Sequence, residues 1–152
     1  MKGVTARIMR VYLDNCCFNR PFDDQQQARI RLETEAKLML QEMIRIGELE
    51  LAWSYILDFE NRANPFDERK TAIEKWKNYS VIDIEENDEL LTKANAFHVM
   101  GFAPQDALHL ACALVTGCEY FVTTDDFILK RATKVTGIRL VDPTFLVREI
   151  DR

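Results

Sequence analysis

Residues 103–126 read APQDALHLACALVTGCEYFVTTDD, and this stretch decides the fold class because it joins one helix to one strand. Pro104 suits the first position of a helix that runs to about Thr116 and ends at Gly117. Residues 119–123 are mostly aromatic and β-branched, so they indicate a strand. A helix leading directly into a strand is typical of an α/β domain.

The same alternation continues in both directions along the chain. The other expected strands lie at residues 10–13, 48–55, 81–84 and 138–141, and the other helices at residues 25–46, 54–60, 65–78 and 86–100, after residue 126 and from residue 143. This order predicts one three-layer α/β/α domain over residues 1–152, with a mostly parallel central sheet of about five strands.

The helix expected at residues 25–46 carries apolar residues with the four-three spacing of an amphipathic helix, and Gly47 closes it. We expect the following residues to face the core: Leu32, Ala36, Met39, Met43 and Ile46. The preceding stretch, residues 15–24, contains a proline and two aspartates and is expected to be a turn-rich loop.

The bulk composition excludes several classes of protein. A chain of 152 residues with 47% apolar residues can bury a core without disulfides, and its cysteine spacings match no zinc site, so the cysteines are expected to be small buried residues. No apolar run approaches the ~20 residues of a membrane span, and the first residues lack the pattern of a signal peptide. We therefore expect a cytoplasmic protein, and the net charge of −5 argues against binding nucleic acid through a broad basic face.

Several acidic residues fall where a parallel sheet binds ligands. Asp14 follows the first expected strand and Asp125 the fourth, so both should lie at the carboxyl edge of the sheet. Asp106 begins the helix that leads into the fourth strand, and spacing alone does not settle whether it reaches the same edge. Taken singly, each acid also has an ordinary explanation: Asp106 at a helix N-terminus, Glu60 as a solvated helix residue, and Asp125 with Asp126 as a cap.

Four segments together resemble the PIN domain, whose best-known bacterial members are VapC-type toxin ribonucleases: VYLDNCC (11–17), SYILDFE (54–60), APQDALHLACA (103–113) and YFVTTDD (120–126). The resemblance covers nearly the whole chain. It implies catalytic roles for Asp14, Glu60, Asp106 and Asp125, with the same four residues and Asp126 as metal ligands. One departure from the family pattern is Asn15, where the family usually has a small hydroxyl residue.

This resemblance implies an endoribonuclease that uses Mg²⁺ or Mn²⁺ and leaves a 3′-hydroxyl and a 5′-phosphate. The chemistry is consistent with the residues, since converging carboxylates repel one another unless hard cations bind between them. Such cations activate water and stabilise the leaving oxygen of a phosphodiester. The residues expected to contact RNA are Asn15, Arg20, Lys130 and Arg131. The resemblance further implies a small protein antitoxin as partner and a homodimer.

Two other functions remain open at this stage. A PIN-like adaptor could bind RNA or a protein without cleavage, although it would have no need to retain the complete acidic set. A receiver-type phosphoacceptor domain normally has two acids after its first strand, whereas Asn15 follows Asp14 here. His109, three residues after Asp106, is interpreted as a hydrogen-bonded histidine beside the core rather than a catalytic one, and His98 as structural.

Overall fold

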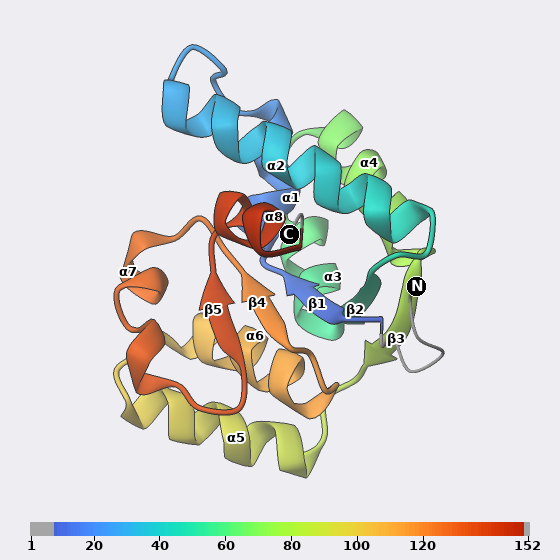
Figure 1. Ribbon diagram of the computed structural model, residues 1–152. Helices are drawn as coiled ribbons and strands as arrows, with labels where there is room; N and C mark the ends of the chain where they lie inside the picture. The colour runs from blue at the N-terminus through green and yellow to red at the C-terminus, as the bar shows by residue number, and fades with distance from the viewer. Residues whose placement is uncertain (1–7, 151–152) are drawn as a thin grey trace.

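The computed structural model describes residues 8–150 and contains a five-stranded sheet in the order β3-β2-β1-β4-β5 (Figure 1). Every neighbouring pair of strands is parallel. The strands are β1 (Arg10–Leu13), β2 (Glu50–Ser54), β3 (Ser80–Ile84), β4 (Tyr120–Val122) and β5 (Arg139–Val141). The fold class expected from the sequence is therefore confirmed. The ends of the expected domain, residues 1–7 and 151–152, lie outside the described residues.

Helices cover both faces of this sheet. They are α1 (Asn15–Asn19), α2 (Ala28–Arg45), α3 (Tyr55–Arg62), α4 (Asp67–Lys77), α5 (Asp88–Val99), α6 (Pro104–Val115), α7 (Asp126–Leu129) and α8 (Pro143–Ile150), with short 3₁₀ turns η1 (Arg20–Phe22) and η2 (Ala132–Lys134). Helices α5 and α6 pack together on one side of the sheet, while α2 and α8 pack together on the other (Figure 1). This arrangement makes the three layers. None of the helices within residues 8–150 is long and apolar enough to cross a membrane.

The two central strands form the inner core. Val11, Tyr12 and Leu13 of β1 are fully buried, and the ring of Tyr12 stacks on Phe121 of β4 at 5.5 Å between centroids. Gly117, which ends α6, has a φ of +77°, a conformation that residues with a Cβ rarely adopt. The helix therefore stops where the sequence predicts, and the chain turns directly into β4.

The stretch from residue 15 to residue 24 differs from the expected loop, because most of it is helical. Asp14 caps α1 by accepting a hydrogen bond from the backbone of Asn15 at 2.8 Å. Cys17 and Phe18 on this helix are buried against the core. Local turn residues were outweighed by the cap and by the burial of these two side chains.

The buried face of α2 also differs from the expected one. Leu32, Met39 and Ile46 are 57%, 52% and 52% exposed, so the prediction that they face the core is wrong. Ala36 is buried as expected, and the other buried residues of α2 are Glu33, Thr34, Lys37, Leu40, Gln41 and Ile44. Partners compensate for the buried charges: Glu33 accepts from Arg20 at 2.9 Å, and Lys37 donates to the Cys17 carbonyl at 2.7 Å. A prediction based on the spacing of apolar residues alone therefore misses a buried face that contains paired charged residues.

Candidate active site at the carboxyl edge of the sheet

Asp14 lies at the end of β1, where neighbouring backbone and side chains fix it. Its backbone N–H donates to the Val122 carbonyl at 2.9 Å, and its Oδ2 accepts from the Thr123 hydroxyl at 2.8 Å. The same hydroxyl oxygen accepts from the backbone of Asp125 at 3.1 Å. The ends of β1 and β4 are thus joined through Thr123, and the Asp14 carboxylate is buried at this edge.

A chain of hydrogen bonds connects the core to Glu60. The Tyr12 hydroxyl lies 2.7 Å from Ser54 Oγ and 2.6 Å from His109 Nδ1. On its other side, His109 Nε2 lies 2.7 Å from Glu60 Oε1 and 4.0 Å from Asp14 Oδ1. Ser54 also caps α3 by accepting from Leu57, as the sequence predicts. His109 therefore sits between two of the candidate acids.

The protonation of His109 follows from these contacts. Burial by itself would lower the pKa of the imidazole. The hydrogen bond to Glu60 and the nearby Asp14 carboxylate outweigh burial, so the pKa of His109 is raised above its ordinary value. A protonated imidazole donates from Nε2 to Glu60 and from Nδ1 to the Tyr12 hydroxyl, and its positive charge partly balances the charges of Glu60 and Asp14.

Asp106 in the first turn of α6 experiences the charge of the other acids. Burial, followed by the charges of Asp14 and Asp125, raises the pKa of Asp106 to about 6, and Glu60 acts in the same direction. The carboxylates of Asp14, Asp125 and Glu60 therefore all lie near enough to Asp106 to act on it. The spacing of the sequence left the position of Asp106 open, and the fold brings it to the same edge.

Asp125 and Asp126 differ in their surroundings. Asp125 is exposed and caps α7 by accepting from Phe127 and Ile128. Asp126 is held by Arg29 of α2 through two hydrogen bonds of 2.8 and 2.9 Å. Its carboxylate is thus engaged by a guanidinium, which makes a role for Asp126 as a metal ligand a weaker proposal than one for Asp125.

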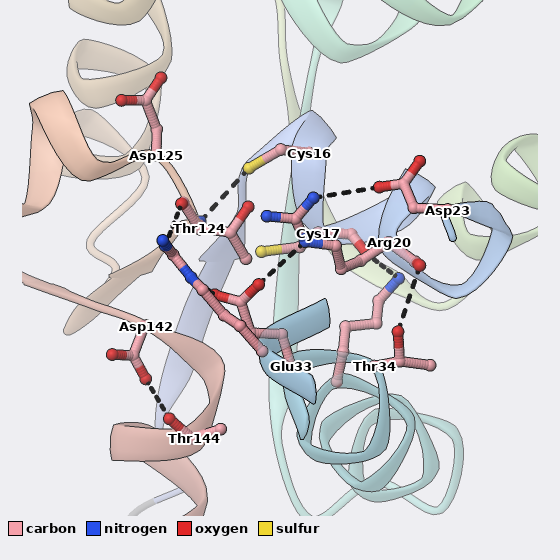
Figure 2. Close-up of polar contacts among 12 residues, drawn as sticks. Cys16, Cys17, Arg20, Asp23, Glu33, Thr34, Thr124, Asp125, Asp142 and Thr144 are labelled. Carbon is pink, nitrogen blue, oxygen red and sulfur yellow. Dashed lines mark hydrogen bonds and ion pairs between the residues drawn. The ribbon is translucent and has the colours of Figure 1, made fainter. Parts of the chain in front are cut away.

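The residues expected to contact RNA are not equivalent either. Arg20 lies between Asp23 and Glu33 and donates to both, as Figure 2 shows. Arg131 is stacked over the Phe127 ring at 3.4 Å from its centroid, whereas Lys130 is exposed beside it. Asn15 follows Asp14 directly, and its Oδ1 is buried with no hydrogen-bond partner among the described residues.

The donor chemistry of this edge suits a hard divalent cation. Among residues 8–150, no three His, Cys, Asp or Glu side chains form a group that could hold a metal ion as they stand. The oxygen donors nevertheless include the buried Asp14 carboxylate, the unpartnered Asn15 Oδ1, and Asp106, whose pKa is raised by burial and then by the charges of Asp14 and Asp125. Mg²⁺ and Mn²⁺ bind such oxygen atoms.

Four residues of this region have contacts with the candidate site that the sequence did not predict: Tyr12, Cys16, Arg29 and His109. Cys16 Sγ, for example, lies 3.6 Å from Asp14 Oδ2. The spacing of three between Asp106 and His109 was a usable signal, because it places both on one face of a helix. Arg29 gave no signal, since its contact spans 97 positions.

The fold is that of chains from VapBC complexes. A chain of VapBC2 from Rickettsia felis, crystallised with a DNA fragment from their promoter, has a TM-score of 0.58 and 10% identity, with 87% of this chain and 97% of that chain covered. A chain of VapBC-1 from nontypeable Haemophilus influenzae has a TM-score of 0.59 and 15% identity, with coverages of 90% and 99%. A chain of DNA-bound VapBC from Salmonella typhimurium has a TM-score of 0.52 and 17% identity, with coverages of 90% and 99%.

At these identities the likeness establishes the fold, and the PIN-type fold expected from the sequence is confirmed. Neither a protein-family profile nor a curated protein matches the sequence. The activity consequently rests on the geometry of the acidic edge.

Proposed function

We propose that this protein is a divalent-metal-dependent endoribonuclease of the VapC type that acts in the cytoplasm as the toxin of a toxin–antitoxin pair. The observation that carries the proposal is that the charges of Asp14, Asp125 and Glu60 all act on the partly buried Asp106, and that burial together with these charges raises the pKa of Asp106 to about 6. Carboxylates that only stabilised the fold would not be gathered where they repel one another.

In this proposal Asp14 and Asp106 hold a Mg²⁺ or Mn²⁺ ion, with Asn15 Oδ1, Asp125 and Asp126 as further candidate ligands. When bound, the ion supplies an activated water and stabilises charge on the phosphodiester oxygens. Thr123 orients the Asp14 carboxylate through its 2.8 Å hydrogen bond. Asp14 is thereby fixed before RNA arrives.

Glu60 has the position of a residue that orients water or accepts a proton. His109 and Gln105 each hold one of its two oxygens, at 2.7 and 2.8 Å. The imidazole is fixed in turn by Tyr12, and Tyr12 by Ser54. This chain limits Glu60 to one orientation, with its carboxylate held ready to accept a hydrogen bond or a proton from a water molecule.

The comparison structures support one of the proposed protein partners. Since the similar chains come from VapBC complexes, a protein antitoxin is the proposed partner, covering the acidic edge when the toxin is idle. The homodimer implied by the family resemblance is proposed as well.

The test is incubation of the purified chain with labelled single-stranded RNAs, with Mg²⁺, with Mn²⁺ and with chelator. Cleavage should require metal and should be lost in Asp14→Asn. A matched control is Asp67→Asn, which changes an exposed aspartate in the first turn of α4 and should cleave like the wild type. RNA that stays intact with both metals, but binds tightly in chelator, would favour the adaptor function instead.

A further inference from the structure

A groove runs between α3 and α6 beside the acidic edge. One face of α3, with Tyr55, Phe59 and Arg62, forms one wall, and Gln105 with Leu108 on α6 forms the other. The groove has a volume of about 490 Å³, within the roughly 300–1,000 Å³ range of small-molecule sites. It can therefore hold a group the size of a nucleobase.

The groove and the acidic edge share a wall. Gln105, which lines the groove, donates from Nε2 to Glu60 Oε2 at 2.8 Å. Glu60 is in turn bound by His109 on the side of Asp14. An RNA whose phosphate lies beside these carboxylates would therefore have a neighbouring nucleotide next to the groove.

The walls present aromatic and apolar surface to such a group. Phe59 is 56% exposed although it is a large apolar side chain, while Ile56 on the same helix is buried. Tyr55 is held in place by its hydrogen bond to Glu86 at 3.2 Å. Exposed rings beside a phosphate-binding site suit bases, which stack on aromatic side chains.

The two carboxylates that line the groove differ in whether other side chains already engage them. Asp58 has both oxygens engaged, Oδ1 by Trp53 at 2.9 Å and Oδ2 by Lys77 at 2.8 Å. Glu85 on the rim is exposed and makes no hydrogen bond or ion pair within residues 8–150, so its carboxylate can accept from a ligand. A carboxylate accepts from exocyclic amino groups such as that of cytosine. Uracil lacks one, and its only ring donor is flanked by two carbonyl oxygens that a carboxylate repels.

We propose that the groove between α3 and α6 binds a nucleobase next to the cleaved phosphate, with stacking on Phe59 and with selection by Glu85 for bases that carry an amino group. This inference rests on the proposed ribonuclease function and adds the class of base that the enzyme accepts.

The test uses free nucleosides, because they carry no phosphate for the acids to repel and cannot be cleaved. Adenosine, cytidine and uridine are titrated into the metal-free protein while NMR follows the methyl signals of Ile56 and Leu108. Adenosine and cytidine should shift these signals saturably, and uridine should bind at least about fivefold more weakly. Glu85→Gln should remove this difference, since a carboxamide can donate as well as accept.

Stacking is tested with a matched pair of variants. Phe59→Ala should weaken adenosine binding by at least about fivefold, the lower end of what loss of a stacked base gives, and Phe59→Tyr should restore it. Phe66→Ala removes an equally exposed ring, 55% against 56%, outside the groove and should bind like the wild type.

Three results would overturn the proposal. The first is the absence of saturable shifts up to the solubility limit of the nucleosides, and the second is equal nucleoside binding by the Phe59→Ala and Phe66→Ala variants. The third is a change of oligomeric state in Phe59→Ala, which would show that the groove is an interface between copies of the chain. These results are independent of the nuclease proposal. Nucleoside binding without metal-dependent cleavage would refute the ribonuclease and leave the groove, and the reverse outcome would refute the groove alone.

Discussion

At the scale of single residues, Asp106 gives the sharpest prediction about the acidic edge. The folded state binds its proton more tightly than the unfolded chain, because the pKa rises from an ordinary 3.8 to about 6. Ionisation therefore costs folding free energy, and this cost is absent below pH 4 and complete above about pH 7. Asp106→Asn should stabilise the metal-free protein above pH 7 and lose that gain as the pH falls to 4.

The expected gain is about 1 kcal/mol, well below the roughly 3 kcal/mol of the full shift, because solvent screens a half-exposed carboxylate. Urea unfolding at several pH values measures it. Asp67→Asn, another aspartate in a first helical turn, serves as control and should give no such gain. Equal stability of Asp106→Asn and wild type at pH 8 would show that the acids do not repel one another.

Lys37 supplies a second prediction with the opposite dependence on pH. Its ammonium is fully buried, donates to the Cys17 carbonyl and lies 4.7 Å from the centroid of Phe18. Burial lowers the pKa of Lys37 to about 7, so above that pH the unfolded chain binds more protons than the folded one. Stability should rise from pH 7 upward by at most about 1.4 kcal/mol per pH unit.

In Lys37→Met this rise should be absent between pH 7 and 8.5. Cys16 also has a lowered pKa and contributes in the same direction, so Cys16→Ser is the control that should retain most of the rise. Parallel pH profiles for wild type and Lys37→Met in urea unfolding would contradict the assignment.

The same residues show how far a sequence can predict a site. Asp14 and Asp125 were found because parallel strands end at one edge, and that rule needs only the order of elements. The role of His109 depends on Tyr12 lying 97 positions earlier, and no local pattern contains that contact. The sequence therefore predicts a hydrogen-bonded histidine beside the core, which is confirmed, but not which residues it bonds.

At the scale of elements, the sequence predicts the order of the strands and of the longer helices, but it predicts neither the helical turns of residues 15–22 nor the buried face of α2. Glycines and prolines mark boundaries locally, as Gly117 and Pro104 do. The buried face of α2 is instead set by distant partners, such as Arg20 for Glu33. Once paired, a charged residue can occupy the inner face and leave leucines and methionines outside.

This description of α2 is tested by a pair of adjacent substitutions. Leu40 is fully buried whereas Met39 is 52% exposed. Leu40→Ala should lower the free energy of unfolding by roughly 2–5 kcal/mol, while Met39→Ala should change it by no more than about 0.5 kcal/mol. Denaturant unfolding separates the two. If Met39→Ala lowered the free energy of unfolding more than Leu40→Ala, the buried face of α2 would be the one that the sequence predicts.

At the scale of the whole molecule, metal binding should couple to stability. A ligand that binds only the folded state adds about 2.7 kcal/mol at a hundredfold excess over its dissociation constant. For a chain of 152 residues this corresponds to a rise of roughly 5–10 °C in melting temperature. Asp14→Asn should reduce the rise, and Asp67→Asn should keep it. An unchanged Tm in millimolar Mg²⁺ and Mn²⁺ would count against a metal site.

The net charge of −5 means that the protein as a whole repels RNA. Because the acidic edge repels phosphate, affinity should depend on divalent metal as well as on ionic strength, and chelation should abolish cleavage. Lys130→Glu should weaken RNA binding while metal-induced stabilisation remains, since this exposed side chain would touch phosphate and not the ion. Arg20 is less suitable, because its reversal would also break the pairs with Glu33 and Asp23.

Fluorescence anisotropy with labelled RNA and calorimetry with metal separate these two effects. Lys93→Glu changes another exposed lysine, on α5, so it matches the change in net charge without altering the surface beside Asp125. If both reversals weaken RNA binding equally, the effect belongs to the charge of the molecule as a whole. If only Lys130→Glu does so, RNA lies along α7, and the cation at the acidic edge attracts a phosphate that the rest of this acidic surface would repel.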